Sequence, residues 1–140
     1  MISLRLVLDT NIVVSAALNP EGLPRAVFLL AITRPARFYV SSPILAEYQD
    51  VLARPELQIR KGLRRQFLAF IRNRTHRVRP RERLEITADP DDNIFLECAN
   101  AAHADYLITG NARHFPRFWK KTKIITSRDF LSLVAPHLLA

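Results

Sequence analysis

The chain has 140 residues, 49% of them apolar and only three of them Gly, which is the composition of a single globular domain over residues 1–140 and excludes a disordered or fibrous chain. The longest apolar run, AVFLLAI from Ala26, is too short to span a bilayer, there is no signal-peptide pattern, and a lone Cys98 excludes an internal disulfide, so we expect a reducing, cytoplasmic setting. The formal net charge of +8 favours a polyanionic partner.

The apolar periodicity of the first half of the chain predicts two strands, each followed by one or two helices. The expected elements are a strand at Leu4–Asp9, helices at Asn11–Leu18 and Leu23–Thr33, a strand at Arg37–Ser41 and a helix over ILAEYQDVLA. In this last helix we expect Ser42 to be the N-cap and Pro43 the first helical residue.

The second half continues the alternation of strands and helices. The expected elements are a basic helix at Gly62–Thr75, a short strand around His76–Val78, a helix opened by Asp89–Pro90 and running to about His103, strands at Tyr106–Thr109 and Lys123–Thr126, and a closing helix at Ser127–Val134 capped by Ser127. Alternating strands and helices imply right-handed crossovers and a parallel sheet covered on both faces. The predicted fold class is therefore α/β, a three-layer α/β/α sandwich.

Two segments hold most of the positive charge. Residues 60–83 contain ten Arg or Lys and one acid, and residues 113–128 contain six more and no acid. Aromatic residues lie among the second group, and such segments suit a nucleic acid, whose bases can stack on aromatic rings. A solubilising helix face explains either segment equally well.

Acidic side chains follow the first two predicted strands. Asp9 follows the apolar run Leu6–Leu8. Glu47 borders the apolar stripe of the helix after the second strand, whereas Asp50 points further out. Each has a simpler explanation, a helix N-cap for Asp9 and a solvated flank for Glu47. Functional groups nevertheless gather beyond the carboxyl ends of parallel strands, where these residues are expected.

A second group of polar residues surrounds the later strand YLI. Asp89, Asp91 and Asp92 crowd one helical turn, which is more acid than capping requires, and like charges repel unless a cation separates them. With Asp89 as the cap, Asp92 becomes a candidate ligand. Asn111 ends YLITGN as Asp9 ends RLVLD, although Asn after Gly is also a common turn residue. Oxygen ligands without His or Cys suit Mg²⁺ or Mn²⁺ and metal-assisted phosphodiester hydrolysis.

The chain resembles the PIN-domain family, specifically the bacterial toxins of toxin–antitoxin systems. The stretches that carry the resemblance are LRLVLDTNIVVSAAL, SSPILAEYQDVL and DPDDNIFLECANAAHADYLITGN, and it extends from about Leu4 to Ser127. It implies a sheet of about five strands in the order 3-2-1-4-5. It also implies a Mg²⁺- or Mn²⁺-dependent endoribonuclease, a small antitoxin protein as partner, and a homodimer or higher oligomer.

The resemblance assigns roles to individual residues. Its metal-binding acids fall on Asp9, Glu47 and Asp92, and the supporting positions are Thr10, Asn11 and Thr109. This chain departs from the family at Asn111, where an Asp is usual. An amide oxygen can ligate a cation but brings no charge and cannot act as a base, so we expect weaker metal binding. Glu97 and Asp105 are nearby in sequence and are candidates to supply the missing charge, but Glu97 lies about 140° from Asp92 on a helical wheel, so we do not expect it to share the site fully.

Three functions follow from these patterns. The leading one is an endoribonuclease whose catalytic and metal-binding residues are Asp9, Glu47, Asp92 and Asn111. Its RNA would be held by basic residues of the two segments, namely Arg64, Arg65, Arg113, Arg117, Lys120 and Lys121. The alternative is a PIN-like RNA-binding module with weak or absent catalysis. A phosphotransferase with Asp9 as nucleophile fits least, since such enzymes use Asp-x-Asp and Asn11 stands at the third position.

Overall fold

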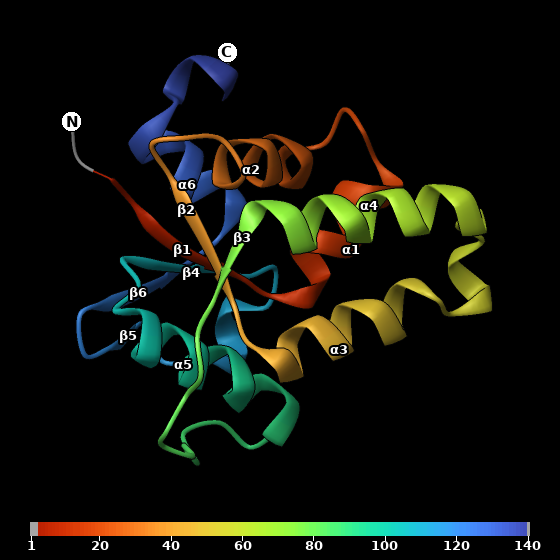
Figure 1. The fold of residues 1–140 in the computed structure, drawn as a ribbon. Helices are drawn as coiled ribbons and strands as arrows, with labels where there is room; N and C mark the ends of the chain where they lie inside the picture. The colour runs from red at the N-terminus through yellow and green to blue at the C-terminus, as the bar shows by residue number, and fades with distance from the viewer. Residues whose placement is uncertain (1–2, 140) are drawn as a thin grey trace.

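A single mixed sheet forms the centre of the protein in a computed structural model that describes residues 3–139 (Figure 1). Its strands lie in the order β3-β2-β1-β4-β6-β5, and all pairs are parallel except β5 with β6. The strands are β1 (Arg5–Leu8), β2 (Arg37–Val40), β3 (Thr75–Arg77), β4 (Tyr106–Ile108), β5 (Phe118–Trp119) and β6 (Thr122–Ile125). The five parallel strands confirm the predicted order 3-2-1-4-5, with β6 in the fifth place.

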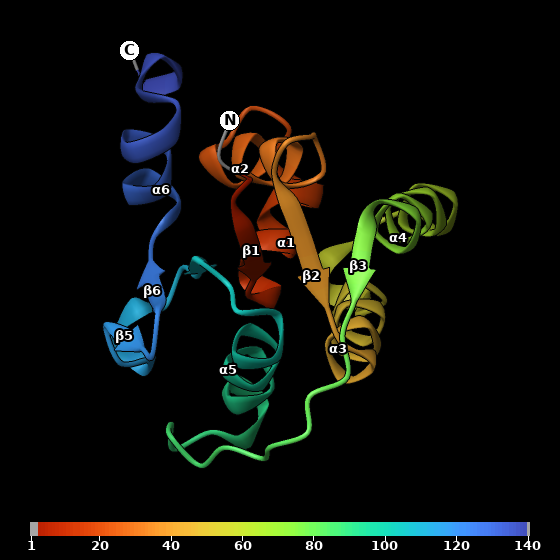
Figure 2. The same ribbon diagram turned by 60° about the vertical axis from the view of Figure 1, so that its left-hand side comes forward.

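Helices cover both faces of this sheet, as the predicted sandwich requires. They are α1 (Thr10–Leu18), α2 (Leu23–Ala31), α3 (Ser42–Leu52), α4 (Lys61–Arg74), α5 (Pro90–Ala102) and α6 (Ser127–Val134). Helix α5 contacts β1, β2 and β4, while α2 contacts both α1 and α6 (Figure 2). No helix within residues 3–139 has the length and apolar character needed to cross a membrane.

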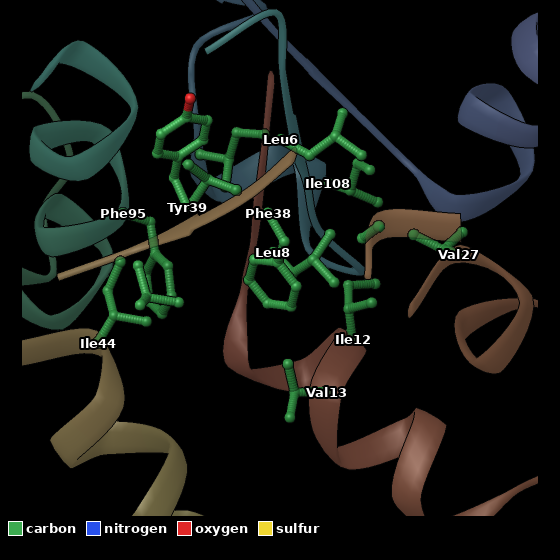
Figure 3. Close-up of a cluster of buried hydrophobic side chains, with 14 of the residues drawn as sticks. Leu6, Leu8, Ile12, Val13, Val27, Phe38, Tyr39, Ile44, Phe95 and Ile108 are labelled. Carbon is green, nitrogen blue, oxygen red and sulfur yellow. The ribbon is translucent and has the colours of Figure 1, made fainter. Parts of the chain in front are cut away.

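The hydrophobic core lies on both sides of the central strands. Leu6, Val7 and Leu8 of β1 are completely buried, which explains why this strand is continuously apolar rather than alternating. Figure 3 shows Phe95 of α5 on one side of the strands and Val27 of α2 on the other. Such close packing fixes the position of β1, and with it the residue that follows.

The observed boundaries correct two predicted helix caps. Ser41, rather than Ser42, caps α3, because its hydroxyl accepts a hydrogen bond from Ile44 N (3.4 Å). Thr126, rather than Ser127, caps α6, and Ser127 is the first helical residue. In both cases two adjacent residues could cap the helix, and the length of the preceding strand decided between them. The other predicted ends agree to within two residues.

The antiparallel strand β5 is a feature that we did not predict. It pairs Phe118 with Lys123 and Trp119 with Thr122, and the turn between the strands places Lys120 at a positive φ of 52°. Two residues are too few to show a strand periodicity in the sequence. The sheet therefore has six strands within the described residues instead of about five.

Candidate active site

The candidate site begins where β1 and β4 end side by side. Leu8 pairs with Ile108, and Asp9 N donates to Ile108 O (2.9 Å), so the next residues, Asp9 and Thr109, are neighbours at the carboxyl edge of the sheet. Thr109 Oγ1 donates to Asp9 Oδ2 (2.7 Å), and Thr10 N donates to Asp9 Oδ1 (2.8 Å). Asp9 is thus the N-cap of α1, which was the simpler of the two explanations for an acid at this position, and its side chain is also hydrogen-bonded to Thr109 at the end of β4.

Glu47 reaches the same edge from α3. Its carboxylate accepts a hydrogen bond from the hydroxyl of Thr10, so Thr10 joins Glu47 to the first turn of α1. The next residue on α3, Tyr48, is completely buried, and its hydroxyl donates to the carbonyl oxygen of Leu8. Helix α3 is therefore fixed to the end of β1, which holds Glu47 near Asp9. Asp50 is exposed, as the helical wheel predicted.

Asp92 enters from the first turn of α5. Asp89 is the N-cap of this helix and accepts from Asp91 N (2.9 Å), as expected, and Asp91 is exposed. Asp92 is partly buried, and its Oδ2 lies 4.0 Å from Nδ1 of His114. The pairing shows that Asp92 faces the loop after β4 rather than bulk solvent.

The three carboxylates influence one another electrostatically. Burial raises the pKa of Asp9, and the hydrogen bonds from Thr109 and Thr10 lower it in part. Burial also raises the pKa of Glu47. The hydrogen bond from Thr10 lowers it in part, and charge repulsion from Asp9, Asp91 and Asp92 raises it further. The pKa of Asp92 is raised by burial and then by the charge of Asp9. Asp9, Glu47 and Asp92 thus form one group of repelling acids, which we call the acidic cluster.

The supporting residues connect the cluster to the loop after β4. Asn11 Oδ1 accepts from Gly110 N (3.0 Å), and Thr109 Oγ1 accepts from Asn111 N (2.9 Å). Asn111 is exposed, and within the described residues its contact with the site is made by its backbone. Thr109 is therefore the link between Asp9 and Asn111.

The acidic cluster has the donor chemistry for a hard divalent cation. All its donors are carboxylate oxygens, and a cation would relieve their repulsion. Within residues 3–139, however, no three such side chains converge closely enough to form a ready-made ligand shell. Mg²⁺ does not need one, because it keeps several waters and is commonly held by one or two carboxylates together with substrate phosphates. The residues present therefore fit such an ion.

The two acids considered as substitutes for a fourth carboxylate lie elsewhere. Glu97 accepts a hydrogen bond from Leu84 N (2.9 Å) in the loop before α5. Asp105 accepts from Arg5 N (2.8 Å) at the start of β1, and is close to Lys121, so it lies at the opposite edge of the sheet. Neither acid contacts the cluster.

The basic residues expected to hold RNA are spread over three places. Arg113 lies in the short helix directly after Asn111, at the cluster's end of the sheet, and Arg117 precedes β5. Lys120 and Lys121 form the turn before β6 and therefore lie at the opposite edge, where Lys121 Nζ is 3.7 Å from Asp105. Two further residues of this set, Arg64 and Arg65, lie on α4.

His114 is a residue near the cluster that sequence reasoning missed. Its proximity to Asp92 lowers the pKa of that carboxyl, and it has the same effect on Asp9. The histidines show no ligand spacing in the sequence, so the only available signal was its position three residues after Asn111.

The fold and site together define an α/β domain with an acidic cluster at the carboxyl edge of its parallel strands. The family model of the PIN domain matches residues 5–113, so the chain belongs to the PIN domain family. PIN domains are generally nucleases that use divalent metal ions.

Two known proteins extend the comparison. An uncharacterized protein of Methanocaldococcus jannaschii is 28% identical over 113 residues, which cover 79% of this chain and 72% of that protein. Among solved structures, VapBC2 from Rickettsia felis bound to a DNA fragment from their promoter matches with a TM-score of 0.59 and 19% identity. That match covers 88% of this chain and 98% of the other, and it supports the fold.

Proposed function

We propose that this protein is a metal-dependent endoribonuclease of the toxin type that hydrolyses phosphodiester bonds at the acidic cluster. The observation that supports the proposal most is that Asp9, Glu47 and Asp92 come from three different elements at the carboxyl end of β1, and that burial together with charge repulsion among acids raises the pKa of Glu47 and Asp92 and burial raises that of Asp9. A PIN fold with such a group at the carboxyl edge of its sheet is suited to binding Mg²⁺ or Mn²⁺ beside a phosphate.

The residues of the cluster would have different roles. Asp9, Glu47 and Asp92 would hold the ion, which supplies positive charge at the phosphate and makes a neighbouring water more acidic. Both oxygens of Asp9 already accept hydrogen bonds, so its orientation is fixed. Asp92 is partly buried and has a raised pKa, which suits it to orient the attacking water and accept its proton. Asn111 would contribute a neutral oxygen.

Cleavage of a labelled single-stranded RNA tests the proposal directly. The wild-type protein should cut it with Mg²⁺ or Mn²⁺ and not with EDTA. Glu47→Gln should reduce the rate by about 100-fold or more, because it removes a negative charge from the ligand set. Asp50→Asn is the matched control, since Asp50 is an exposed acid on the same helix. Equal cleavage by wild type and Asp9→Asn would exclude the assignment.

A second function, RNA binding with little or no catalysis, is favoured by the absence of a fourth acid at Asn111. The substitution Asn111→Asp distinguishes the two functions. If the site is weakened but active, the added charge should increase Mn²⁺ affinity in calorimetry and the rate of cleavage. Calorimetry without Mn²⁺ binding to either protein would favour the non-catalytic function.

We also propose a small antitoxin protein as partner and a homodimer or higher oligomer. The similar solved structure supports this, because it is that of VapBC2 bound to a DNA fragment from their promoter. Co-expression with the product of a neighbouring small open reading frame should yield a complex by size-exclusion chromatography, and RNA cleavage by that complex should be suppressed. A protein that remains monomeric, and active in the presence of that product, would contradict the proposed partners.

A further inference from the structure

A groove of about 580 Å³ lies beside the acidic cluster. It shares Thr109, Gly110 and Asn111 with the candidate site, and it continues between α1, the turn before α2 and the start of α6. Its volume is within the range of small-ligand sites, roughly 300–1,000 Å³. A strand whose reacting phosphate lies at the cluster could therefore extend into this groove.

The groove differs from the neighbouring cluster in its charge. Arg128 is the one charged residue that lines it, and the other polar groups there are amides and hydroxyls, such as those of Asn11 and Ser15. Asp129 is exposed in the same helical turn but does not line the groove. An anion is therefore favoured in the groove, whereas a cation is favoured in the cluster.

Backbone donors add to this preference at the start of α6. Thr126 Oγ1 accepts from Asp129 N (3.2 Å), and the first backbone bond of the helix runs from Phe130 N to Thr126 O (3.0 Å). The N–H groups of Ser127 and Arg128 come before that bond and have no partner within the helix. Such groups, together with the helix dipole, attract phosphate.

The Ser127 hydroxyl is an independent sign of a missing ligand. Ser127 lines the groove and is only 8% exposed, yet among the described residues its Oγ has no hydrogen-bond partner. A buried hydroxyl without a partner lowers stability, so such a group in a native protein calls for an explanation. A phosphate oxygen in the groove would accept its hydrogen bond.

We propose that this groove binds a phosphate group of the nucleic acid strand next to the one at the acidic cluster. Ser127 would donate from its hydroxyl, Arg128 from its guanidinium, and the first turn of α6 from its N–H groups. The inference rests on the proposed function for the position of the strand. Thr109 joins the two sites, because it contacts Asp9 and also lines the groove.

Binding without cleavage provides the first test. The Asp9→Asn protein in EDTA is titrated into a fluorescein-labelled, eight-nucleotide single-stranded RNA, and anisotropy gives the Kd. Adding Arg128→Ala should weaken binding about 5- to 20-fold and reduce the slope of log K against log salt by about 0.7. Arg54→Ala, which removes the same charge from an exposed position outside the groove, should change the Kd less than about twofold.

Ser127→Ala separates a binding role from a structural one. Because the hydroxyl has no partner among residues 3–139, its removal should leave the Tm unchanged or raise it. The same variant should weaken RNA binding about 3- to 10-fold without changing the salt slope, since the hydroxyl is neutral. A lower Tm with unchanged Kd would show a purely structural Ser127 and overturn its assignment.

The outcomes distinguish this inference from the proposed function. If both groove variants bind RNA as tightly as the parent, the groove assignment is wrong, whether or not the wild type cleaves RNA. If both weaken binding but the wild type cleaves with neither Mg²⁺ nor Mn²⁺, the groove assignment stands and the nuclease proposal fails. If the parent does not bind RNA at all, the groove is not a site for such a strand.

Discussion

The hydrogen bond between Thr109 and Asp9 connects residues 100 positions apart, and its loss can be measured. Thr109→Val keeps the shape of the side chain but replaces the hydroxyl, which donates to Asp9 and accepts from Asn111 N, with a methyl group. Thr109→Ser keeps the hydroxyl and removes the methyl group. The two variants therefore separate the hydrogen bond from the packing at a position that is completely buried.

The structure gives the size of the expected effect. The bond is short, 2.7 Å, and its acceptor is a carboxylate that is only 6% exposed, so water cannot easily replace the donor. A hydrogen bond to a charged group contributes about 1.5–3 kcal/mol. At about 2–4 °C per kcal/mol for a protein of this size, Thr109→Val should lower the Tm by roughly 3–12 °C at pH 7. Thr109→Ser should cost about 0.5–1.5 kcal/mol for the lost methyl group.

The pH dependence of this loss identifies its cause. The hydrogen bond from Thr109 lowers the pKa of Asp9, which means that it favours the ionised carboxylate. Without this bond the pKa of folded Asp9 is higher, so the contribution of the bond is complete above the pKa of Asp9 in the Thr109→Val protein and falls as the pH drops through that value and then through the lower wild-type value. As the pH falls, the difference in unfolding free energy between wild type and Thr109→Val should decrease toward the value of a neutral hydrogen bond, about 0.5–1.5 kcal/mol.

Urea denaturation in EDTA, followed by circular dichroism from pH 7 to pH 4, measures both effects. EDTA removes any contribution from a bound cation. Two results would refute the reasoning: a Thr109→Val protein no less stable than Thr109→Ser at pH 7, or a loss that stays constant as the pH falls.

Three further predictions follow from the same structure. Burial raises the pKa of Asp9 in the folded state, so the ionised carboxylate destabilises the fold, and wild-type stability should rise as the pH falls through that pKa. For the same reason, Asp9→Asn should have a higher Tm than wild type at pH 7 in EDTA. In thermal scans, excess Mn²⁺ should raise the Tm of the wild type only. Ser41→Ala should cost about 1 kcal/mol of unfolding free energy in urea and Ser42→Ala less than about 0.5 kcal/mol; the reverse order would contradict the observed cap. Arg113→Ala should weaken RNA binding, measured by anisotropy, more than Lys121→Ala, because of these two residues only Arg113 lies at the cluster's end of the sheet. Equal losses of affinity would argue against an RNA strand that passes over the acidic cluster.

The sequence was sufficient for the order and type of most elements. The apolar run of β1 and the helical stripe around Glu47 follow from local periodicity, which is set by backbone geometry and does not depend on distant residues. The resemblance to PIN domains supplied the strand order that the structure confirms. Helix starts were less certain, because Ser41 and Ser42 can both cap a helix and only the end of β2 selects one of them.

The sequence by itself determined which residues could form an acidic site, since the acids follow apolar strands and crowd one helical turn. Only the tertiary structure decided which residues meet. Thr109 reaches Asp9 because β1 and β4 are neighbours, whereas Lys121 lies at the far edge because an unpredicted turn precedes β6. The unsatisfied hydroxyl of Ser127 is likewise visible only once the chain has folded around it. Such contacts depend on the packing of segments far apart in sequence, and local patterns carry no information about it.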